Sequence, residues 1–333
     1  MVTRFSIYLC VVKISKDIAK AAQLLKEGKV VAMPTETVYG LAANSFDPSA
    51  ISEVFAVKER PATNPLIVHI HSLDQLAPLV IEMSPNAQKL AEQFWPGPLT
   101  LLLKKSDRVS DQVTANSPYV ALRMPKHPVA LELLKAVSFP LVAPSANRYT
   151  TVSPTTAEHV LQNLGERIPL ILDGGPCEKG LESTVVGFDS EDRPLVYRLG
   201  AITLESLQSV VQESVLFEAP PSGPAHSPGS TKKHYAPSTP LKVVEDLKAL
   251  LTHYSGSEKI GVLSFGHENL TTRQTTVVEL SQTKDLEEAS RNLYRGLYAL
   301  DEAKVDLIVA EWFENKGLGR TLNDKLKRAS FIG

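Results

Sequence analysis

Apolar residues near the start of the chain recur with two different periods. Between positions 16 and 28 they lie three or four residues apart, which predicts an amphipathic helix that ends at Gly28. The residues of this apolar face are Ile18, Ala21, Ala22 and Leu25. A short run at positions 30–33 then predicts a buried strand that ends at Pro34. Similar runs predict strands at positions 66–70, 99–103, 119–124, 141–143 and 170–173.

Helical patterns alternate with these strands at positions 84–95, 127–137 and 153–165. In the last of them, Thr155 and Glu158 have the spacing of a capping box, and Gly165 is typical of a helix end. Strands that alternate with helices predict an α/β layer structure.

The composition changes between positions 218 and 240, where proline, glycine, serine and threonine predominate. Such a segment predicts a linker rather than a packed element. Beyond it, strands are expected at positions 259–265 and 305–312, and an amphipathic helix at 285–304. The apolar side of that helix carries Leu286, Leu293, Leu297 and Leu300. We therefore expect a first domain at 14–212, a linker at 213–240 and a smaller α/β domain at 241–333.

Composition and charge narrow the function classes. The 333 residues are 43% hydrophobic and 22% charged, as in ordinary globular proteins, and the length favours two domains. The formal net charge of −2 argues against a protein that mainly grips a nucleic-acid backbone. The first residues are too interrupted for a signal peptide or membrane span, and the two cysteines fit a reducing compartment, so we expect a cytoplasmic protein.

Two cations stand before a predicted strand, in the stretch "KERPATNPLIVHI". In an extended segment, Lys58 and Arg60 would point to the same face, where they could hold phosphate oxygens. A solvated basic surface is the alternative. Thr35 follows the first predicted strand, at the kind of strand end where α/β proteins bind ligands.

Other polar residues accompany later strands. Arg123 stands within an apolar run, which indicates either an ion pair or a carboxylate clamp. His69 and His71 share one face of a strand, but no third ligand supports a metal site, and we expect none. The double glycine at 174–175 would let the backbone approach a ligand closely, although neither a phosphate-binding loop nor a dinucleotide fingerprint is present. Cys177 lacks the context of a nucleophile.

Taken in order, a set of motifs resembles the long, two-domain form of the L-threonylcarbamoyladenylate synthase family. The motifs are "PTETVYGLAANSFD", "KERPATNPLIVHI", "WPGPLTLLLKK", "VALRMPKHP", "PSAN", "DGGPCEKGLESTVV", "KHYAP" and "GLGRTLNDKLKRAS". The resemblance covers nearly the whole chain. It implies a YrdC-like domain, with a twisted mixed sheet around a large concave cavity, and a smaller Rossmann-like α/β domain.

The resemblance also implies a reaction and a site. Family members condense L-threonine, bicarbonate and ATP, and a partner transferase complex uses the product on tRNA. Mg²⁺ would be held mainly by the ATP phosphates. L-threonine would be held by Thr35, His69, Arg123 and Ser183. Catalysis would depend on Lys58 and Arg60, and ATP would contact Lys58, Arg60, Asn64, Ser145, Asn147, Ser153, Arg198 and Tyr235. The linker carrying Tyr235 would close over the cavity as a lid.

One stretch departs from the family. A serine-glycine pair often follows the asparagine of "PSAN", whereas this chain has the bulkier residues 148–152, which leaves the path of that loop open. Two rival functions remain: an RNA-binding or translation-associated module without catalysis, and a carbamoyl-transfer enzyme of hydrogenase maturation. The second needs zinc-finger modules for which this chain has too few cysteines.

Overall fold

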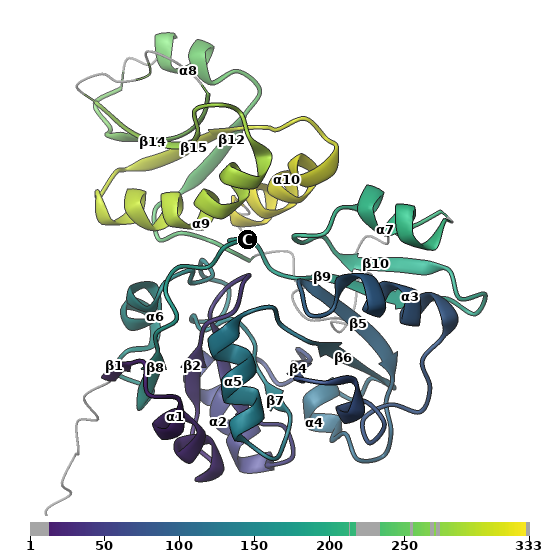
Figure 1. Ribbon diagram of the computed structural model, residues 1–333. Helices are drawn as coiled ribbons and strands as arrows, with labels where there is room; N and C mark the ends of the chain where they lie inside the picture. The colour runs from purple at the N-terminus through teal and green to yellow at the C-terminus, as the bar shows by residue number, and fades with distance from the viewer. Residues whose placement is uncertain are drawn as a thin grey trace, which may run out of the picture.

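The computed structural model describes residues 13–212, 214–217, 234–253, 256–266, 270 and 274–330, which form two sheets covered by helices (Figure 1). Positions 218–233, most of the predicted linker, lie outside the described residues. No described helix is long and apolar enough to cross a membrane.

The first sheet is mixed, with parallel and antiparallel neighbours, as predicted. Its described strands are, in spatial order, β1 (Lys13–Ser15), β8 (Leu170–Leu172), β2 (Val31–Met33), β3 (Gly40–Asn44), β7 (Leu141–Val142), β4 (Ile67–His69), β6 (Tyr119–Arg123), β5 (Leu99–Lys104), β9 (Thr184–Phe188), β10 (Pro194–Arg198) and β11 (Leu216–Phe217). The helices around it are α1 (Ile18–Lys26), α2 (Pro48–Lys58), α3 (Pro85–Phe94), α4 (Asp111–Thr114), α5 (Pro128–Ala136), α6 (Ala157–Leu164) and α7 (Leu204–Val211), with a 3₁₀ turn η1 (Leu73–Gln75).

Strand β2 shows why one half of this sheet is buried on both faces. Alternate side chains of a strand point to opposite faces. Val31 and Met33 accordingly join a core cluster with α1 and α5, whereas Ala32 joins the cluster that contains α2. A continuous apolar run is what such a strand requires.

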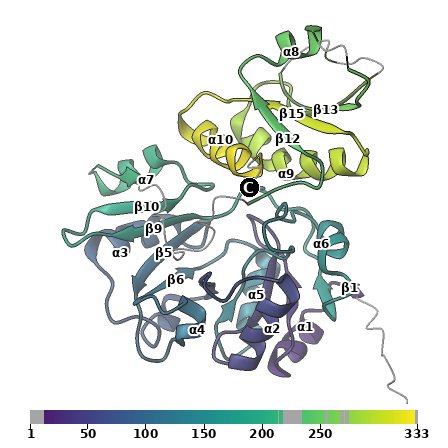
Figure 2. The same cartoon turned by 180° about the vertical axis from the view of Figure 1, so that it is seen from behind.

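The second sheet is entirely parallel, in the order β12 (Leu241–Val244), β15 (Leu307–Glu311), β13 (Ile260–Phe265) and β14 (Thr275–Ser281). Its helices are α8 (Leu247–His253), α9 (Leu286–Glu302) and α10 (Gly317–Ala329). Figures 1 and 2 show α9 and α10 on the side of the sheet that faces the first domain. The expected second, smaller α/β domain is present.

The two domains share one hydrophobic cluster. Val38, Val152 and Leu181 of the first domain lie in it with Leu293 and Leu297 of α9. Hydrogen bonds also cross the interface and run from Tyr298 Oη to the Val152 carbonyl (2.8 Å), from Thr321 Oγ1 to the Gly200 carbonyl (3.1 Å) and from Lys325 Nζ to the Leu199 carbonyl (2.8 Å). The second domain therefore packs tightly against the first, through both apolar contacts and hydrogen bonds.

Two local predictions are wrong. Lys58 and Arg60 do not share an extended segment, because Lys58 is the last residue of α2 and Glu59 caps it in the left-handed conformation, at φ 55°. The capping box is also misplaced by one residue. Thr156, not Thr155, is the N-cap of α6, and its hydroxyl accepts from the amide of His159.

Candidate active site

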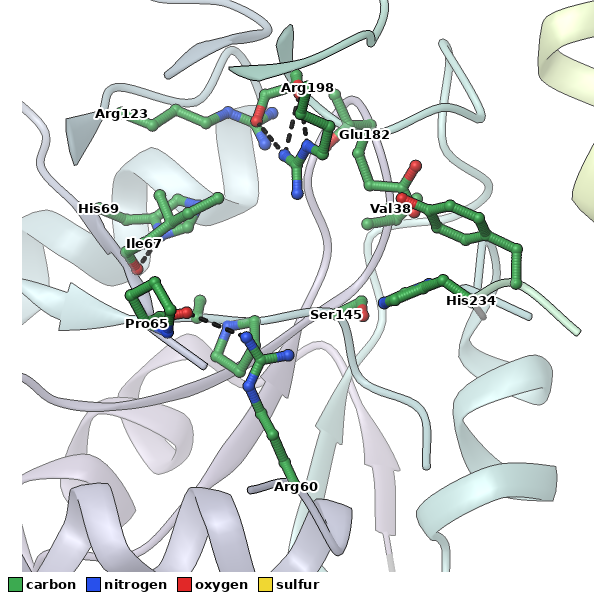
Figure 3. Close-up of a pocket in the computed structure, with 15 residues that line it drawn as sticks. Val38, Arg60, Pro65, Ile67, His69, Arg123, Ser145, Glu182, Arg198 and His234 are labelled. Atoms are coloured by element: carbon green, nitrogen blue, oxygen red, sulfur yellow. Dashed lines mark hydrogen bonds between the residues drawn. The ribbon is translucent and has the colours of Figure 1, made fainter. Parts of the chain in front are cut away.

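A polar cavity lies over the half of the sheet formed by β4, β6 and β9. Its empty space is about 520 Å³. Figure 3 shows Arg60, Arg123 and Arg198 pointing into this space from different sides. Its lining is Thr37, Val38, Arg60, Pro65, Ile67, His69, Arg123, Ala143, Pro144, Ser145, Glu182, Ser183, Arg198, His234 and Tyr235.

Strand register places His69 directly beside Arg123. The two residues are paired in the parallel ladder of β4 and β6, with Ile67 paired to Ala121 two positions earlier. Paired residues on neighbouring strands point to the same face of a sheet, so His69 and Arg123 both extend into the cavity. Burial and the nearby Arg123 lower the pKa of His69 to about 3, which keeps its imidazole neutral.

Arg123 has a partner that the sequence did not identify. One of its guanidinium nitrogens lies 2.7 Å from a carboxylate oxygen of Glu36, and both side chains are buried. Its Nε donates to the Gly97 carbonyl over 3.3 Å. The contact with Glu36 is an ion pair without hydrogen-bond alignment, because neither carboxylate oxygen of Glu36 accepts an aligned donor from the described residues. The ion pair predicted for Arg123 is therefore confirmed, and because Arg123 also lines the cavity, the carboxylate clamp stays a prediction.

Ser183 and Arg198 form one hydrogen-bonded unit at the start of β9. Arg198 donates from Nε (3.1 Å) and Nη2 (2.9 Å) to the Ser183 carbonyl, and from Nη2 to the Ser183 hydroxyl (2.9 Å). The Thr100 hydroxyl lies 2.7 Å from that of Ser183. These contacts hold the Arg198 guanidinium at the cavity although burial lowers its pKa.

Lys58 and Arg60 are both buried and act on different parts of the site. Lys58 Nζ donates to the carbonyls of Ser145 (2.5 Å) and Asn147 (2.6 Å), so it fixes the segment after β7 rather than the cavity itself. Burial, and then the charge of Arg60, lower the pKa of Lys58 well below its usual value. Arg60 lines the cavity and donates from Nη2 to the Pro65 carbonyl over 2.9 Å, and burial lowers its pKa to about 10.

Loop 148–152, whose path the sequence left open, runs beside these cations. The amide of Tyr149 donates to the Lys58 carbonyl (2.9 Å), and the Tyr149 hydroxyl accepts from Asn64 Nδ2 (2.8 Å). The guanidinium of Arg60 lies 5.9 Å from the centre of the Tyr149 ring. Further along, Thr151 pairs with Ala236 in an isolated bridge, which joins the loop to the end of the linker.

The described end of the linker reaches the cavity. Both His234 and Tyr235 line it and are buried, and their rings lie 4.1 Å apart. Lys325 and Arg328 of α10 each lie 4.9 Å from the centre of the Tyr235 ring. Burial and the surrounding cations lower the pKa of His234 well below its usual value.

The predicted site residues divide into two groups. Those that line the cavity are Arg60, His69, Arg123, Ser145, Ser183, Arg198 and Tyr235. Those that lie behind its lining are Thr35, Lys58, Asn64, Asn147 and Ser153. Thr35 stabilises its own turn, since its hydroxyl accepts from the Val38 amide (3.2 Å) and donates to the Val38 carbonyl (2.6 Å). Asn147 Nδ2 likewise donates within its own loop, to the carbonyls of residues 148 and 151.

Sequence reasoning missed eight cavity residues, namely Thr37, Val38, Pro65, Ile67, Ala143, Pro144, Glu182 and His234. All eight stand inside or next to motifs that had been recognised, so only the side-chain directions were unknown. Gly174 packs closely against the fold, and the approach of the double glycine to a ligand stays a prediction. A Cβ on Gly174 would lie 2.5 Å from His127 Cε1, so the close approach is to a side chain of the fold. Cys177 is buried, which raises the pKa of its thiol and makes it inert.

The charges of the lining indicate what the cavity can hold. Three guanidinium groups face a space in which Glu182 is the one carboxylate among the described lining residues. Such a site favours a ligand with several negative charges. Among the described residues, no group of three or more histidine, cysteine or acidic side chains could hold a metal ion.

Comparisons with known proteins agree with this geometry. A domain family described as "Telomere recombination" matches residues 23–200, and one described as "Threonylcarbamoyl-AMP synthase, C-terminal domain" matches residues 202–330. The chain is 40% identical over 322 residues to the threonylcarbamoyl-AMP synthase of Pyrococcus abyssi, with 93% of each chain covered. It is 40% identical over 333 residues to that of Bacillus subtilis, covering 94% of this chain and 93% of the relative.

A solved structure extends the likeness to three dimensions. The crystal structure of P. abyssi Sua5 complexed with L-threonine matches with a TM-score of 0.88 at 40% identity and covers 94% of both chains. The boundary between the two domain matches, near residue 201, does not coincide with the end of the first sheet, because β11 lies beyond that boundary and still pairs with β10. From the two domain matches and the identity over nearly the full length, the chain belongs to the threonylcarbamoyl-AMP synthase family, enzymes of the nucleotidyltransferase type.

Proposed function

We propose that this protein is an L-threonylcarbamoyladenylate synthase, which condenses L-threonine, bicarbonate and ATP to threonylcarbamoyl-AMP and pyrophosphate. The observation that carries the proposal is the cavity lined by three guanidinium groups in a chain 40% identical to synthases of that name. A separate transferase complex would move the threonylcarbamoyl group to the adenosine next to the anticodon of tRNA. The enzyme itself would meet tRNA only indirectly.

The amino acid would lie at the end of the cavity formed by β4 and β6. Arg123 presents a fork of donors that suits the threonine carboxylate, and Glu36 holds that fork in place. Neutral His69 and the Ser183 hydroxyl offer hydrogen bonds without adding charge. Thr35 would act through its turn, which positions Thr37 and Val38 at the cavity.

The nucleotide would occupy the remaining space, with its phosphates toward Arg60 and Arg198. Lys58, Asn64 and Asn147 would support this end indirectly, because their hydrogen bonds fix the loops on which Ser145 and Tyr149 stand. Ser153 would support it through Glu182. Tyr235 would close the cavity from the linker and keep water away from a labile mixed anhydride. Mg²⁺, held mainly by phosphate oxygens, would offset further charge on the triphosphate.

The reaction needs two bond-forming steps. The threonine amine first joins bicarbonate to give a carbamate and water. A carbamate oxygen then attacks the α-phosphorus, and the bond to the bridging oxygen breaks as pyrophosphate leaves. Negative charge grows on the α-phosphoryl oxygens and the leaving group, where fixed guanidinium groups stabilise it. Position and charge therefore supply the catalysis in this proposal, and Lys58 and Arg60 contribute through the site that they shape.

Pyrophosphate release tests the proposal. We expect release from ATP only when threonine and bicarbonate are both present, and loss of most release in Arg60→Gln. Arg320→Gln is the matched control, because Arg320 lies on α10 and donates to Glu205 and to the Asn315 carbonyl, which are not among the lining residues of the cavity. Equal release without threonine would refute the synthase activity. Binding of RNA that falls steeply with salt and ignores threonine would favour the rival RNA-binding module instead.

A further inference from the structure

The carboxylate of Glu182 joins the cavity to the second domain. Glu182 lines the cavity, on the side opposite His69 in Figure 3. One of its oxygens accepts from the Ser153 hydroxyl over 2.6 Å, and the other accepts from the Tyr294 hydroxyl over 2.9 Å. Ser153 belongs to the first domain, whereas Tyr294 belongs to α9 of the second. All three side chains are buried.

Two donors on two different oxygens fix the direction of a carboxylate. Hydrogen bonds to a charged group are stronger than neutral ones, so this arrangement resists rotation. The direction matters because Glu182 lies among the cavity's guanidinium groups, and its charge acts on Arg198 and Arg328. A released carboxylate could turn toward them and neutralise the charge that phosphate oxygens require.

Tyr294 is well placed to act as this donor. Its side chain is fully buried in the cluster shared by both domains, and its ring stacks on that of Tyr235 with centroids 5.6 Å apart. Burial and the nearby Glu182 raise the pKa of Tyr294 well above its usual value, so the hydroxyl keeps its proton.

We propose that Tyr294 is a positioning residue of the active site, through which the second domain holds Glu182, and with it Ser153, in the orientation that the nucleotide end of the cavity needs. This inference rests on the proposed function, since it assigns the polyphosphate of ATP to that end. It gives the second domain a direct part in substrate binding.

The test compares Tyr294→Phe with Tyr298→Phe. Both tyrosines stand on α9, one turn apart, and both hydroxyls make hydrogen bonds to the first domain. That of Tyr298 donates to the Val152 carbonyl and accepts from Asn163, which are not cavity residues. We expect Tyr294→Phe to weaken ATP binding about tenfold, as the loss of a hydrogen bond to a charged group would do. Threonine binding should stay unchanged, and Tyr298→Phe should change neither.

Calorimetric titration with ATP and, separately, with threonine gives the dissociation constants without turnover. The measurement therefore remains valid if pyrophosphate release fails and the proposed reaction is wrong. Glu182→Gln removes the negative charge that the Tyr294 hydroxyl orients. In that background, adding Tyr294→Phe should weaken ATP binding by much less than it does in the wild type. Equal effects of the two phenylalanine variants on ATP binding, or an unchanged ATP affinity in Tyr294→Phe, would show that Tyr294 is an interface contact only and overturn the inference.

Discussion

At the scale of the residue, the pair formed by Glu36 and Arg123 decides how the side of the cavity at β4 and β6 is built. A buried arginine needs an anionic partner, and Glu36 supplies it from the turn after β2. The Glu36 carboxylate partly balances the charge of Arg123 at the cavity. This lowers the free-energy cost of burying the guanidinium group when no ligand is bound. The same turn carries Thr37 and Val38, so one short segment both holds Arg123 and lines the site.

Removing the Glu36 charge should be costly. We expect Glu36→Gln to lower the free energy of unfolding by about 3–5 kcal/mol, because it leaves the Arg123 charge buried without a partner. Urea unfolding followed by circular dichroism measures the change. Glu314→Gln is the control, since it removes one charge of an exposed pair with Lys316 and should cost less than about 1 kcal/mol. Equal losses in both variants would mean that Arg123 does not depend on Glu36.

At the scale of the element, loop 148–152 forms a structured connection between the first domain and the end of the linker. Tyr149 packs beside Arg60 and binds Asn64, while Thr151 pairs with Ala236 of the linker. Thr150, between them, has a φ of 69°, which a β-branched residue adopts only with strain. The loop thus accepts a local cost in free energy at the point where it joins the Arg60 side of the cavity to the linker.

Glycine at this position should relieve the strain. We expect Thr150→Gly to raise the free energy of unfolding by about 1 kcal/mol, because glycine adopts positive φ freely and the gain exceeds its extra entropy in the unfolded chain. Thr151→Gly, the neighbouring control, should lower it, since it deletes the hydroxyl that donates to the Arg148 carbonyl over 2.9 Å. Denaturant melts of the two variants decide the matter, and a loss of stability in Thr150→Gly would contradict the strain.

At the scale of the whole molecule, burial within the first domain and at its contact with the second keeps several histidines in neutral form. Burial lowers the pKa of His69 to about 3 and that of His159 to about 4, and it also lowers those of His127 and His234. His159 stacks on Tyr298 of the second domain with ring centroids 3.9 Å apart, and His234 lies at the end of the linker. Their protonation would bring charge into the cavity and the interface.

The fold should therefore weaken in acid. In the unfolded chain the His69 imidazole binds a proton near pH 6.5, whereas in the folded protein it binds one only near pH 3. The free energy of unfolding therefore falls as the pH drops from 6.5 toward 3. Each such histidine contributes about 1.4 kcal/mol per pH unit within its window. Urea melts at pH 6, 5.5 and 5 give the free energy of unfolding at each pH. Between these values it should fall less steeply with falling pH in His69→Asn than in the wild type, and at pH 7–8 the two proteins should show the same dependence on pH. Equal slopes below pH 6 would contradict a neutral buried His69.

The sequence alone determined the alternation of elements, the family and seven of the fifteen described residues that line the cavity. Helix and strand periods are local, so α1, β2 and α9 follow from their own residues, and the motifs keep the same order as in the family. The local prediction failed for Lys58, because contacts with residues distant in the sequence decide the direction of its side chain. Lys58 ends a helix because α2 packs on the core, and its amine turns to the carbonyls of Ser145 and Asn147.

Only the tertiary structure decided which side chains face the cavity. Glu36 meets Arg123, and Glu182 meets Tyr294, across separations that no spacing in the chain encodes. The position of a buried charge depends on the partner that offsets its desolvation, and that partner comes from wherever the fold brings an opposite charge or a donor. For the same reason the sequence predicted a linker and a second domain, but only their packing places Tyr235 and Tyr294 at the site.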